Sequence, residues 1–212
     1  MMATATLTET PVVHLIDDDD SLRMALGRLL DAAGFAVRAY ASAADFLLAR
    51  QGTLRGCLVL DVRMPGGPSG LELQKALNRQ GEKLPVIFLT AHGDIPMSVQ
   101  AIKNGAFDFL TKPVEREALL DTVRAALACE EAAQQASTKQ RDITVRANRL
   151  TRTESEVFQR VAEGQPNKQI AAELGCCERT VKAHRSQVMV KMGATSLAEL
   201  ARLFEMLSQP VD

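Results

Sequence analysis

The sequence predicts two joined domains, an α/β domain with a five-stranded, doubly wound parallel sheet and an all-α helix-turn-helix domain of four helices. In the first part of the chain, apolar runs of strand length alternate with helical patterns. In the last part, four short helical patterns follow one another, and the stretch EEAAQQASTKQRD between the two parts has the composition of a linker. We expect domains over residues 10–128 and 148–212, joined by a partly helical linker over residues 129–147.

Five short apolar runs predict the strands of the first domain: residues 12–16, 35–40, 57–60, 86–89 and 107–110. Helical patterns between them include Leu22 to Leu30 closed by Gly34, residues 43–48, residues 71–77, a helix around Val99 and Ile102, and a helix that begins after Pro113. Such alternation is typical of a parallel sheet with helices on both faces. Functional groups in these sheets gather beyond the carboxyl ends of the strands.

Polar side chains stand where four of the predicted strands end. Asp17 and Asp18 follow the first strand, Asp61 the third, Thr90 the fourth and Lys112 the fifth. Carboxylates brought together repel one another unless a cation such as Mg²⁺ neutralises them. A lysine and a hydroxyl beside that cation can hold the oxygens of a transferred phosphoryl group. The combination predicts a phosphoryl-transfer site in which the carboxylate of Asp61 is the nucleophile.

The strings HLIDDDDSLR, LVLDVRMPGG, FLTAHGDIPM and FDFLTKPV resemble, in order and in separation, the four motifs of a response-regulator receiver domain. The resemblance covers residues 11–128 and implies a flavodoxin-like fold. It also implies that Asp61 takes a phosphoryl group from a histidine kinase. Asp17 and Asp18 would form the acidic pocket, with Asp18, Asp61 and the backbone carbonyl of Arg63 on Mg²⁺.

The same resemblance assigns the other polar residues of the site. It implies that Thr90 is the switch hydroxyl, Lys112 the cation that binds the phosphoryl group, and Phe109 the switch aromatic residue. Two features depart from the family pattern. The loop from Met64 to Gly70 is one residue longer than usual, and the aspartate run leaves two surplus residues, of which we expect Asp19 to assist the pocket and Asp20 to cap the first helix.

Capping and stop signals delimit the four helices of the second domain. The helices are predicted from the capping box Thr151–Glu154 to Gly164, from Asn167 to Gly175, from Glu178 to Met192 before Gly193, and from the capping box Ser196–Glu199 through Leu207. Four short helices of this kind fit a helix-turn-helix unit with flanking support.

The third of these helices divides into two faces. At about 100° per residue, Val181, His184, Val188 and Met192 form one stripe, which we expect to pack against the other helices. In a helix-turn-helix the opposite face lies in the DNA major groove. Lys182 is our candidate for reading the edge of a guanine base, whereas we expect Lys168, Thr180 and Arg185 to contact DNA phosphates. The full set of expected DNA contacts is Lys168, Arg179, Thr180, Lys182, Ala183, Arg185 and Ser186.

The strings LTRTESEVF, EGQPNKQIAAELG and RTVKAHRSQVMVKMGATSLAEL resemble a LuxR-type helix-turn-helix domain over residues 148–207, and HRSQVMVKMGATSLAEL suggests the FixJ-like subgroup of the NarL/FixJ class. The sequence departs from the family at Cys176 and Cys177, where an aliphatic residue and Ser are usual. Cys177 is a poor substitute for a Ser N-cap, at a cost of roughly 1 kcal/mol. It is also the one position at which the sequence allows a thiol-dependent effect on DNA binding.

Composition excludes several other classes of protein. The chain has 25 basic and 26 acidic residues, no Trp and one Tyr. It has no apolar run long enough for a membrane span and no signal-peptide pattern, which excludes membrane and secreted proteins. It also has no Cys or His spacing typical of a zinc site. The first 130 residues carry 13 basic and 16 acidic side chains, and the remainder carry 12 and 10. We therefore expect a cytoplasmic protein with reduced thiols, an acidic first part and a locally basic second part.

Together these patterns predict a phosphorylation-controlled, sequence-specific DNA-binding transcription regulator that is not an enzyme acting on a separate substrate. The expected partners are a cognate sensor histidine kinase, promoter DNA, a second copy of the phosphorylated chain, and RNA polymerase, with no membrane. One alternative is a Mg²⁺-dependent aspartyl-phosphate phosphatase of the haloacid dehalogenase type, which expects its nucleophile after the first strand. A second alternative is a receiver with an RNA-binding or protein-binding output.

Overall fold

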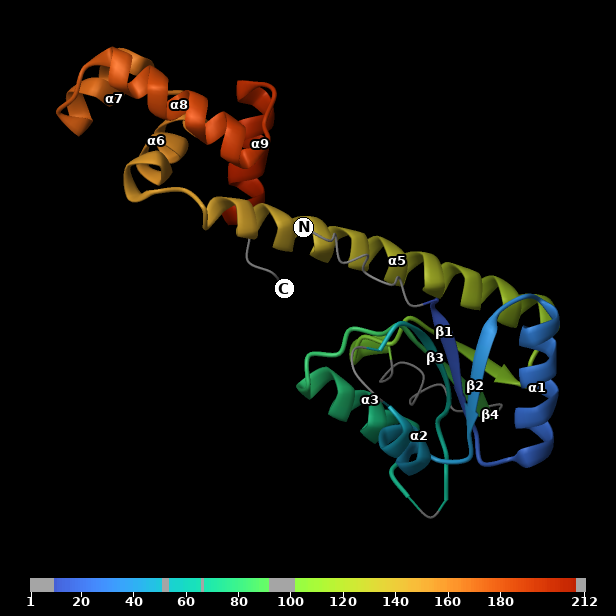
Figure 1. The fold of residues 1–212 in the computed structure, drawn as a ribbon. Coiled ribbons are helices and arrows are strands. Elements are labelled where there is room, and N and C mark those ends of the chain that lie inside the picture. The colour runs from blue at the N-terminus through green and yellow to red at the C-terminus, as the bar shows by residue number, and fades with distance from the viewer. Residues whose placement is uncertain (1–9, 51–53, 66, 92–101, 209–212) are drawn as a thin grey trace. The chain divides into compact units, whose positions relative to one another are not determined.

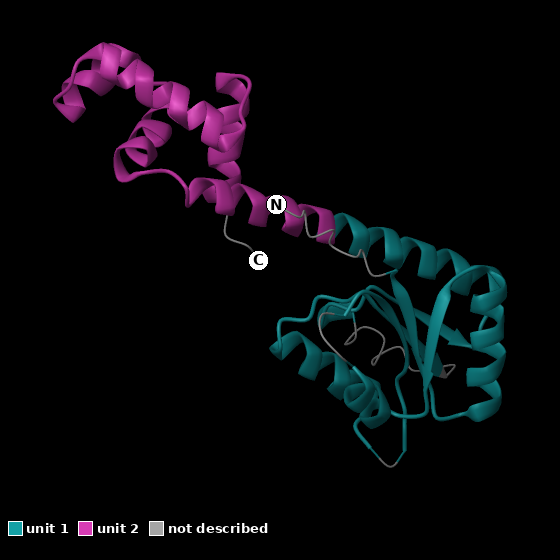
Figure 2. Cartoon of the chain, in the orientation of Figure 1, with its two compact units in different colours: residues 1–133 teal, residues 134–212 magenta. Residues whose placement is uncertain are grey.

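The computed structural model describes residues 10–50, 54–65, 67–91 and 102–208. The chain divides into two compact units, residues 1–133 and residues 134–212 (Figure 2). Each unit has a hydrophobic core of its own, and each is described by itself below. Among the described residues, no helix combines the length and the apolar composition that a membrane crossing requires.

Unit 1 contains the predicted five-stranded parallel sheet, with strand order β2-β1-β3-β4-β5 (Figure 1). Its strands are β1 (Val12–Ile16), β2 (Ala36–Tyr40), β3 (Gly56–Asp61), β4 (Val86–Ala91) and β5 (Asp108–Lys112). Three of the strands extend further than their apolar runs. Asp61 and Lys112 are consequently the last residues of β3 and β5, and Thr90 lies within β4 rather than after it. The difference arises because strand pairing continues through polar residues once neighbouring strands supply the hydrogen bonds.

Helices cover the sheet of unit 1 on both faces (Figure 1). Side chains of α1 (Asp20–Ala32) and α5 (Arg116–Ala147) pack on one face, where Val13 and Leu15 are buried. Side chains of α2 (Ala43–Ala49) and α3 (Gly70–Arg79) pack on the other face. The helix predicted around Val99 falls largely outside the described residues.

The cap of α1 differs from the sequence prediction. Asp19 is the N-cap, with an extended backbone and a carboxylate that accepts hydrogen bonds from the backbone N–H groups of Ser21 and Leu22. Asp20, which we expected to cap the helix, is its first helical residue and forms an ion pair with Arg23 instead. A cap must keep a non-helical backbone while its side chain folds back onto the first turn, and only Asp19 does so.

Helix α5 is continuous over 32 residues, so the segment 129–147 that we expected to be a partly helical linker is helical throughout. Its last turns belong to unit 2, as the change of colour along the helix in Figure 2 shows. Ile143 is 2% exposed within the core of that unit, and Gln140 Nε2 donates to the carbonyl of Met206 at 2.6 Å. Arg146 Nη1 donates to the carbonyl of Met192 at 3.1 Å. These contacts make residues 140–147 a structural part of unit 2.

The four predicted helices of unit 2 are present as α6 (Arg152–Ala162), α7 (Asn167–Leu174), α8 (Glu178–Met192) and α9 (Leu197–Ser208). Gly175 and Gly193 end α7 and α8 with left-handed backbones, at φ of 63° and 67°, which glycine adopts without strain. The capping box of Thr151 and Glu154 is confirmed. The second predicted box is only half formed.

In that second box, Ser196 Oγ accepts a hydrogen bond from the backbone N–H of Glu199, as predicted. The carboxylate of Glu199 binds the backbone N–H and the hydroxyl of Thr195, one residue earlier than the pattern requires. The chain just before α9 therefore places Thr195, and not Ser196, within reach of the carboxylate.

The burial of Ile143 predicts that unit 2 depends on the end of α5. We expect Ile143→Ala to lower the free energy of unfolding of unit 2 by about 3 kcal/mol, because it leaves a cavity in a packed core. Circular dichroism at 222 nm follows the helices of both units, so a transition seen by circular dichroism but not by fluorescence belongs to unit 2. Tyr40 is the only tyrosine and the chain has no tryptophan, so intrinsic fluorescence follows unit 1 separately.

The matched control is Val145→Ala, on the same helix but at a side chain 51% exposed. It is expected to change stability by less than about 0.5 kcal/mol. Equal effects of the two substitutions, or a shift in the fluorescence transition alone, would contradict the assignment of Ile143 to the core of unit 2.

Unit 1 also contains a buried histidine whose charge state couples stability to pH. His14, on β1, is 3% exposed, its Nδ1 lies 3.3 Å from the hydroxyl of Tyr40, and its ring meets Phe46 edge to face. Burial, and next the positive charge of Arg38, lower the pKa of His14 from 6.5 to about 4, although a hydrogen bond that the ring donates to the backbone carbonyl of Arg55 opposes them. The folded unit therefore favours the neutral imidazole.

Because the folded pKa lies below the unfolded one, the stability contributed by neutral His14 is complete above pH 6.5 and falls between pH 6.5 and 4. We expect a loss of up to about 3 kcal/mol over that range. Urea unfolding followed by Tyr40 fluorescence at several pH values measures it. His14→Leu should flatten this part of the pH dependence, and an unchanged slope would contradict the prediction.

Candidate functional site

The carboxyl edge of the sheet brings three predicted carboxylates together. Asp17 follows β1, Asp18 comes next in the chain, and Asp61 ends β3. One oxygen from each lies within 4.8 Å of the others. Asp17 is fully buried, Asp61 is 8% exposed and Asp18 is exposed to solvent. Solvent therefore reaches the cluster at Asp18, whereas the protein interior encloses Asp17 and Asp61.

Lys112 reaches this cluster from the end of β5. Its Nζ donates to Asp17 Oδ2 at 2.8 Å and to Asp61 Oδ2 at 2.7 Å. Burial raises the pKa of Asp17, and the hydrogen bond from Lys112 opposes that shift only in part. Burial works against the charge on Lys112, but its hydrogen bonds to Asp17 and Asp61 outweigh burial and raise its pKa. Lys112 is therefore an ammonium group at neutral pH.

Backbone groups hold the two buried carboxylates in place. Asp17 Oδ1 accepts the N–H of Asp19 at 2.9 Å, and Asp61 Oδ1 accepts the N–H of Arg63 at 3.1 Å. Gly70, the first residue of α3, lies so close to Asp61 that a Cβ on it would stand 2.3 Å from the Asp61 carbonyl oxygen. Only a residue without a side chain fits there, so the start of α3 helps to define the position of Asp61.

The donor set fits a hard divalent cation. Three carboxylates and one ammonium group leave an excess of negative charge, and carboxylate oxygens are the protein ligands that Mg²⁺ prefers. Asp17, Asp18 and Asp61 form the one such cluster of His, Cys, Asp and Glu side chains within the described part of the chain. The carbonyl of Arg63 as a further ligand stays a prediction.

Thr90 and Phe109 occupy neighbouring strands. Thr90 on β4 is 5% exposed and pairs in register with Thr111, whereas Phe109 on β5 pairs with Phe88 and is 38% exposed. Thr90 is thus close to the carboxyl edge, and Phe109 lies two residues further back along β5. Their roles as switch residues stay predictions.

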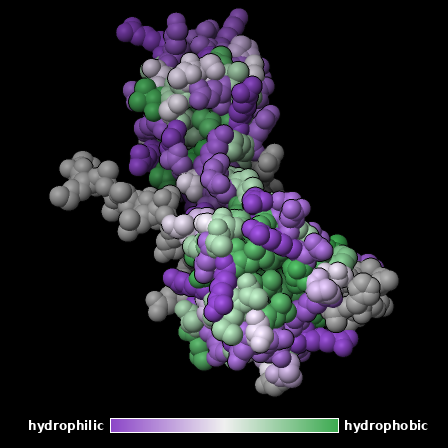
Figure 3. Space-filling view, turned by 90° about the vertical axis from the view of Figure 1, so that its right-hand side faces the viewer, coloured by the Kyte–Doolittle hydropathy of each residue, from purple (hydrophilic) through white to green (hydrophobic). Residues whose placement is uncertain are grey.

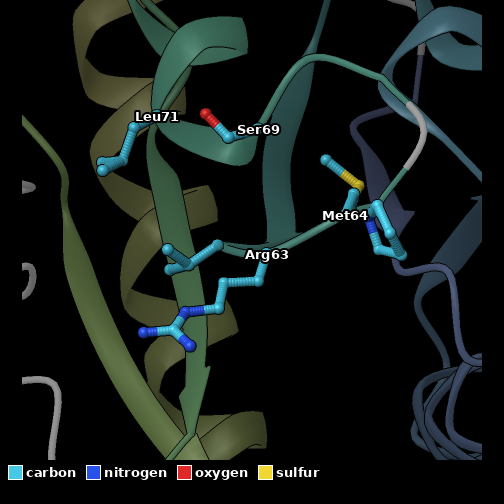
Figure 4. A pocket seen from close by; sticks show the side chains of 6 residues that line it. Arg63, Met64, Ser69 and Leu71 are labelled. Carbon is cyan, nitrogen blue, oxygen red and sulfur yellow. The ribbon is translucent and has the colours of Figure 1, made fainter.

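A hollow beside Asp61 escaped the sequence analysis. It has a volume of about 360 Å³ and its lining residues are Val62, Arg63, Met64, Pro65, Ser69 and Leu71. Figure 4 shows Arg63 and Met64 on separate sides of the loop that leads to α3. Ser69 caps α3 in a capping box with Glu72, and the Ser-x-x-Glu spacing of these two residues is the sequence signal that could have predicted it.

The predicted DNA-contacting residues gather on α7 and α8. Val181, Val188 and Met192 are buried in the core of unit 2, and α8 therefore turns its opposite face outward. Arg179, Lys182, Ala183, Ser186 and, on α7, Lys168 are exposed, whereas Thr180 and Arg185 are half-buried. Hydrophilic side chains predominate on the part of this unit seen in Figure 3.

Two residues near this face have partners that the sequence did not reveal. Arg185 Nη1 donates to the side-chain oxygen of Asn167, which links α8 to the start of α7. Cys177 occupies the N-cap of α8 without a side-chain cap hydrogen bond, and its Sγ lies 3.2 Å from the hydroxyl of Thr180. That hydroxyl lowers the pKa of the exposed Cys177 thiol.

Known families match both units. The response regulator receiver domain matches residues 13–124, and the bacterial regulatory proteins of the luxR family match residues 148–204. Transcriptional regulatory protein FixJ of Azorhizobium caulinodans is 44% identical over 197 residues, which cover 93% of each chain. The chain is a response regulator of the NarL/FixJ type.

Other relatives extend this agreement over nearly the whole chain. Response regulator protein TodT of Pseudomonas putida is 43% identical to this response regulator, over 95% of this chain and 88% of its own. Among solved structures, response regulator StyR matches with a TM-score of 0.83 at 46% identity, over 92% of this chain and 98% of its own. Full-length FixJ from B. japonicum matches with a TM-score of 0.58 at 40% identity, over 93% and 97%.

The response regulator is accordingly a phosphorylation-controlled transcription regulator, with a receiver domain that implies a sensor kinase and a LuxR-type domain that implies DNA binding. The family is one of transcription regulators rather than classical enzymes. The phosphatase alternative is not supported, because it requires its nucleophile after β1 and assigns no role to residues 148–204. The LuxR-type match likewise favours a DNA-binding output over an RNA-binding or protein-binding one.

Proposed function

We propose that Asp61 accepts the phosphoryl group of this response regulator from a sensor histidine kinase, with Mg²⁺ held by Asp17, Asp18, Asp61 and the backbone carbonyl of Arg63. The observation that carries the proposal is the position of Lys112, whose ammonium group bridges Asp17 and Asp61 at the edge of the sheet. A lysine within hydrogen-bonding distance of the acceptor carboxylate is placed to bind the phosphoryl group that arrives there.

The transfer itself needs little covalent chemistry from the protein. A carboxylate oxygen of Asp61 attacks phosphorus, the bond from phosphorus to the kinase histidine nitrogen breaks, and that nitrogen takes up a proton. Mg²⁺, when bound, supplies positive charge to the phosphoryl oxygens. Lys112 supplies a second cation, and the hydroxyl of Thr90 donates to another phosphoryl oxygen. The chain thus assists only its own phosphorylation and dephosphorylation.

Phosphorylation changes the hydrogen bonding of the site. Lys112 binds Asp61 Oδ2 in the present structure, and the phosphoryl group replaces that oxygen as its partner. Thr90 moves toward the phosphoryl group and Phe109, partly exposed on β5, changes its position. We propose that the face around β5 then forms a homodimer, which tethers two DNA-binding units and raises their combined affinity.

In the output domain, α8 enters the major groove. Lys182 reads a guanine edge, and Lys168, Thr180 and Arg185 bind phosphates, with Arg179, Ala183 and Ser186 on the same outward face. The bound regulator then recruits RNA polymerase to the promoter. It acts in the cytoplasm, because promoter DNA is there.

The test combines both units in one protein. The chain is incubated with acetyl phosphate and Mg²⁺, its phosphorylation is followed by intact mass, and it is then used to select fragments from a genomic promoter library. We expect one added phosphoryl group, which is absent when Asp61 is replaced by Asn, and stronger selection of promoter DNA after treatment. Absence of label on Asp61 would overturn the phosphorylation site, and absence of selected DNA would overturn the assigned DNA-binding face.

A further inference from the structure

The four consecutive aspartates after β1 have different partners. Asp17 and Asp18 contribute to the acidic cluster with Asp61, and Asp19 caps α1. Asp20 is exposed and turns to an arginine of its own helix. Only two of the four carboxylates therefore face the cluster, although all four lie within one short stretch of chain.

Arg23 is the residue that joins the two ends of this stretch. Its Nη1 donates to the backbone carbonyl of Asp17 at 2.7 Å, and its Nη2 forms an ion pair with the carboxylate of Asp20. The Arg23 side chain is 16% exposed, and it projects from the first turns of α1. A guanidinium group holds several donors in one rigid plane, so it can bind both oxygens at once.

We infer that Arg23 is a positioning residue for the cation site, an inference that rests on the Mg²⁺ site proposed above. By holding the carbonyl of Asp17, it fixes the turn from which the carboxylates of Asp17 and Asp18 extend. By pairing with Asp20, it keeps a fourth carboxylate away from the cluster. Three carboxylates and Lys112 leave two net negative charges, which one divalent cation balances.

The inference predicts an effect on metal affinity that is separate from the phosphorylation reaction. Groups that orient metal ligands commonly contribute 10-fold or more to metal affinity, and we expect Arg23→Ala to weaken Mg²⁺ binding by about 10-fold. Arg23→Lys keeps one donor and the charge but loses the planar fork, so an intermediate affinity is expected. Asp20→Asn removes the ion pair and leaves the bond to the carbonyl of Asp17, so it should stay within about twofold of wild type on the same scale.

Isothermal titration calorimetry of the full chain with MgCl₂ at 25 °C, without any phosphodonor, measures these affinities. Thermal unfolding of unit 1, followed by Tyr40 fluorescence without Mg²⁺, separates positioning from stability. A purely structural role for Arg23 would lower the melting temperature and leave the Mg²⁺ affinity at 25 °C unchanged. That result would overturn the inference.

Asp18→Asn distinguishes this inference from the proposed function. If wild type binds Mg²⁺, Asp18→Asn binds it weakly and Arg23→Ala binds it like wild type, the cation site stands and the role of Arg23 fails. If Asp20→Asn is as damaging as Arg23→Ala, the bond to the carbonyl of Asp17 is not what matters, and the inference fails as well. If wild type does not bind Mg²⁺, or Asp18→Asn binds it unchanged, the proposed cation site and the inference fail together.

Discussion

Asp61→Asn is expected to abolish phosphorylation of the chain. The amide keeps the size of the carboxylate and can still accept a hydrogen bond from Lys112, but it is not a competent nucleophile toward phosphorus. Intact-mass measurement after incubation with acetyl phosphate and Mg²⁺ should show no phosphorylated species. Promoter affinity measured by fluorescence anisotropy should consequently be the same before and after that incubation.

The matched control is Asp31→Asn, which makes the same chemical change at an exposed position on α1. It should be phosphorylated as fast as wild type. Tyr40 fluorescence checks that unit 1 stays folded in both variants. Stoichiometric labelling of Asp61→Asn would show that another residue is the acceptor.

Lys182→Ala is expected to weaken binding to the selected promoter by about 10- to 100-fold and to relax the base preference at one position of the site. Lys182 is exposed on the outward face of α8, whose opposite face is buried through Val181 and Val188. A side chain in this place reaches a base edge when the helix lies in the major groove. Titrations with the promoter and with single-base variants measure the loss and the preference.

Lys168→Ala provides the comparison, because it removes the same charge from an exposed position on α7. As a phosphate contact it should weaken binding to all sequences alike and lower the salt dependence of log K by about one unit of slope. If Lys168→Ala changed base preference and Lys182→Ala did not, the two assigned roles would have to be exchanged.

Local patterns in the sequence predicted most of the elements that carry the site. The apolar runs before Asp17, Asp61, Thr90 and Lys112 identified four strands whose carboxyl ends meet at one edge, because parallel strands all end at the same edge of a sheet whatever their order. The capping box at Thr151 predicted the start of α6 for the same reason. Such signals depend on residues a few positions apart.

Where several local choices were equivalent, the sequence could not select among them. The four consecutive aspartates all have a carboxylate that can cap α1 or bind a metal ion. The path of the chain after β1 decided that Asp19 caps α1 and that Asp20 pairs with Arg23. The stretch 129–147 had a polar, linker-like composition, yet it is helical throughout, and Ile143 is buried at its end. A helical segment of polar composition and weak amphipathicity gains most of its stability from packing, which local composition does not reveal.

The sequence by itself therefore determined the two domains, the parallel sheet, the set of polar residues at its carboxyl edge and the outward face of α8. Each of these follows from periodicity and from spacing within one element. Only the tertiary structure decided which atoms meet: Lys112 between Asp17 and Asp61, Gly70 against the Asp61 carbonyl, and Arg23 on the carbonyl of Asp17. Contacts between residues of different elements or loops depend on how the chain packs in three dimensions, and no local pattern encodes them.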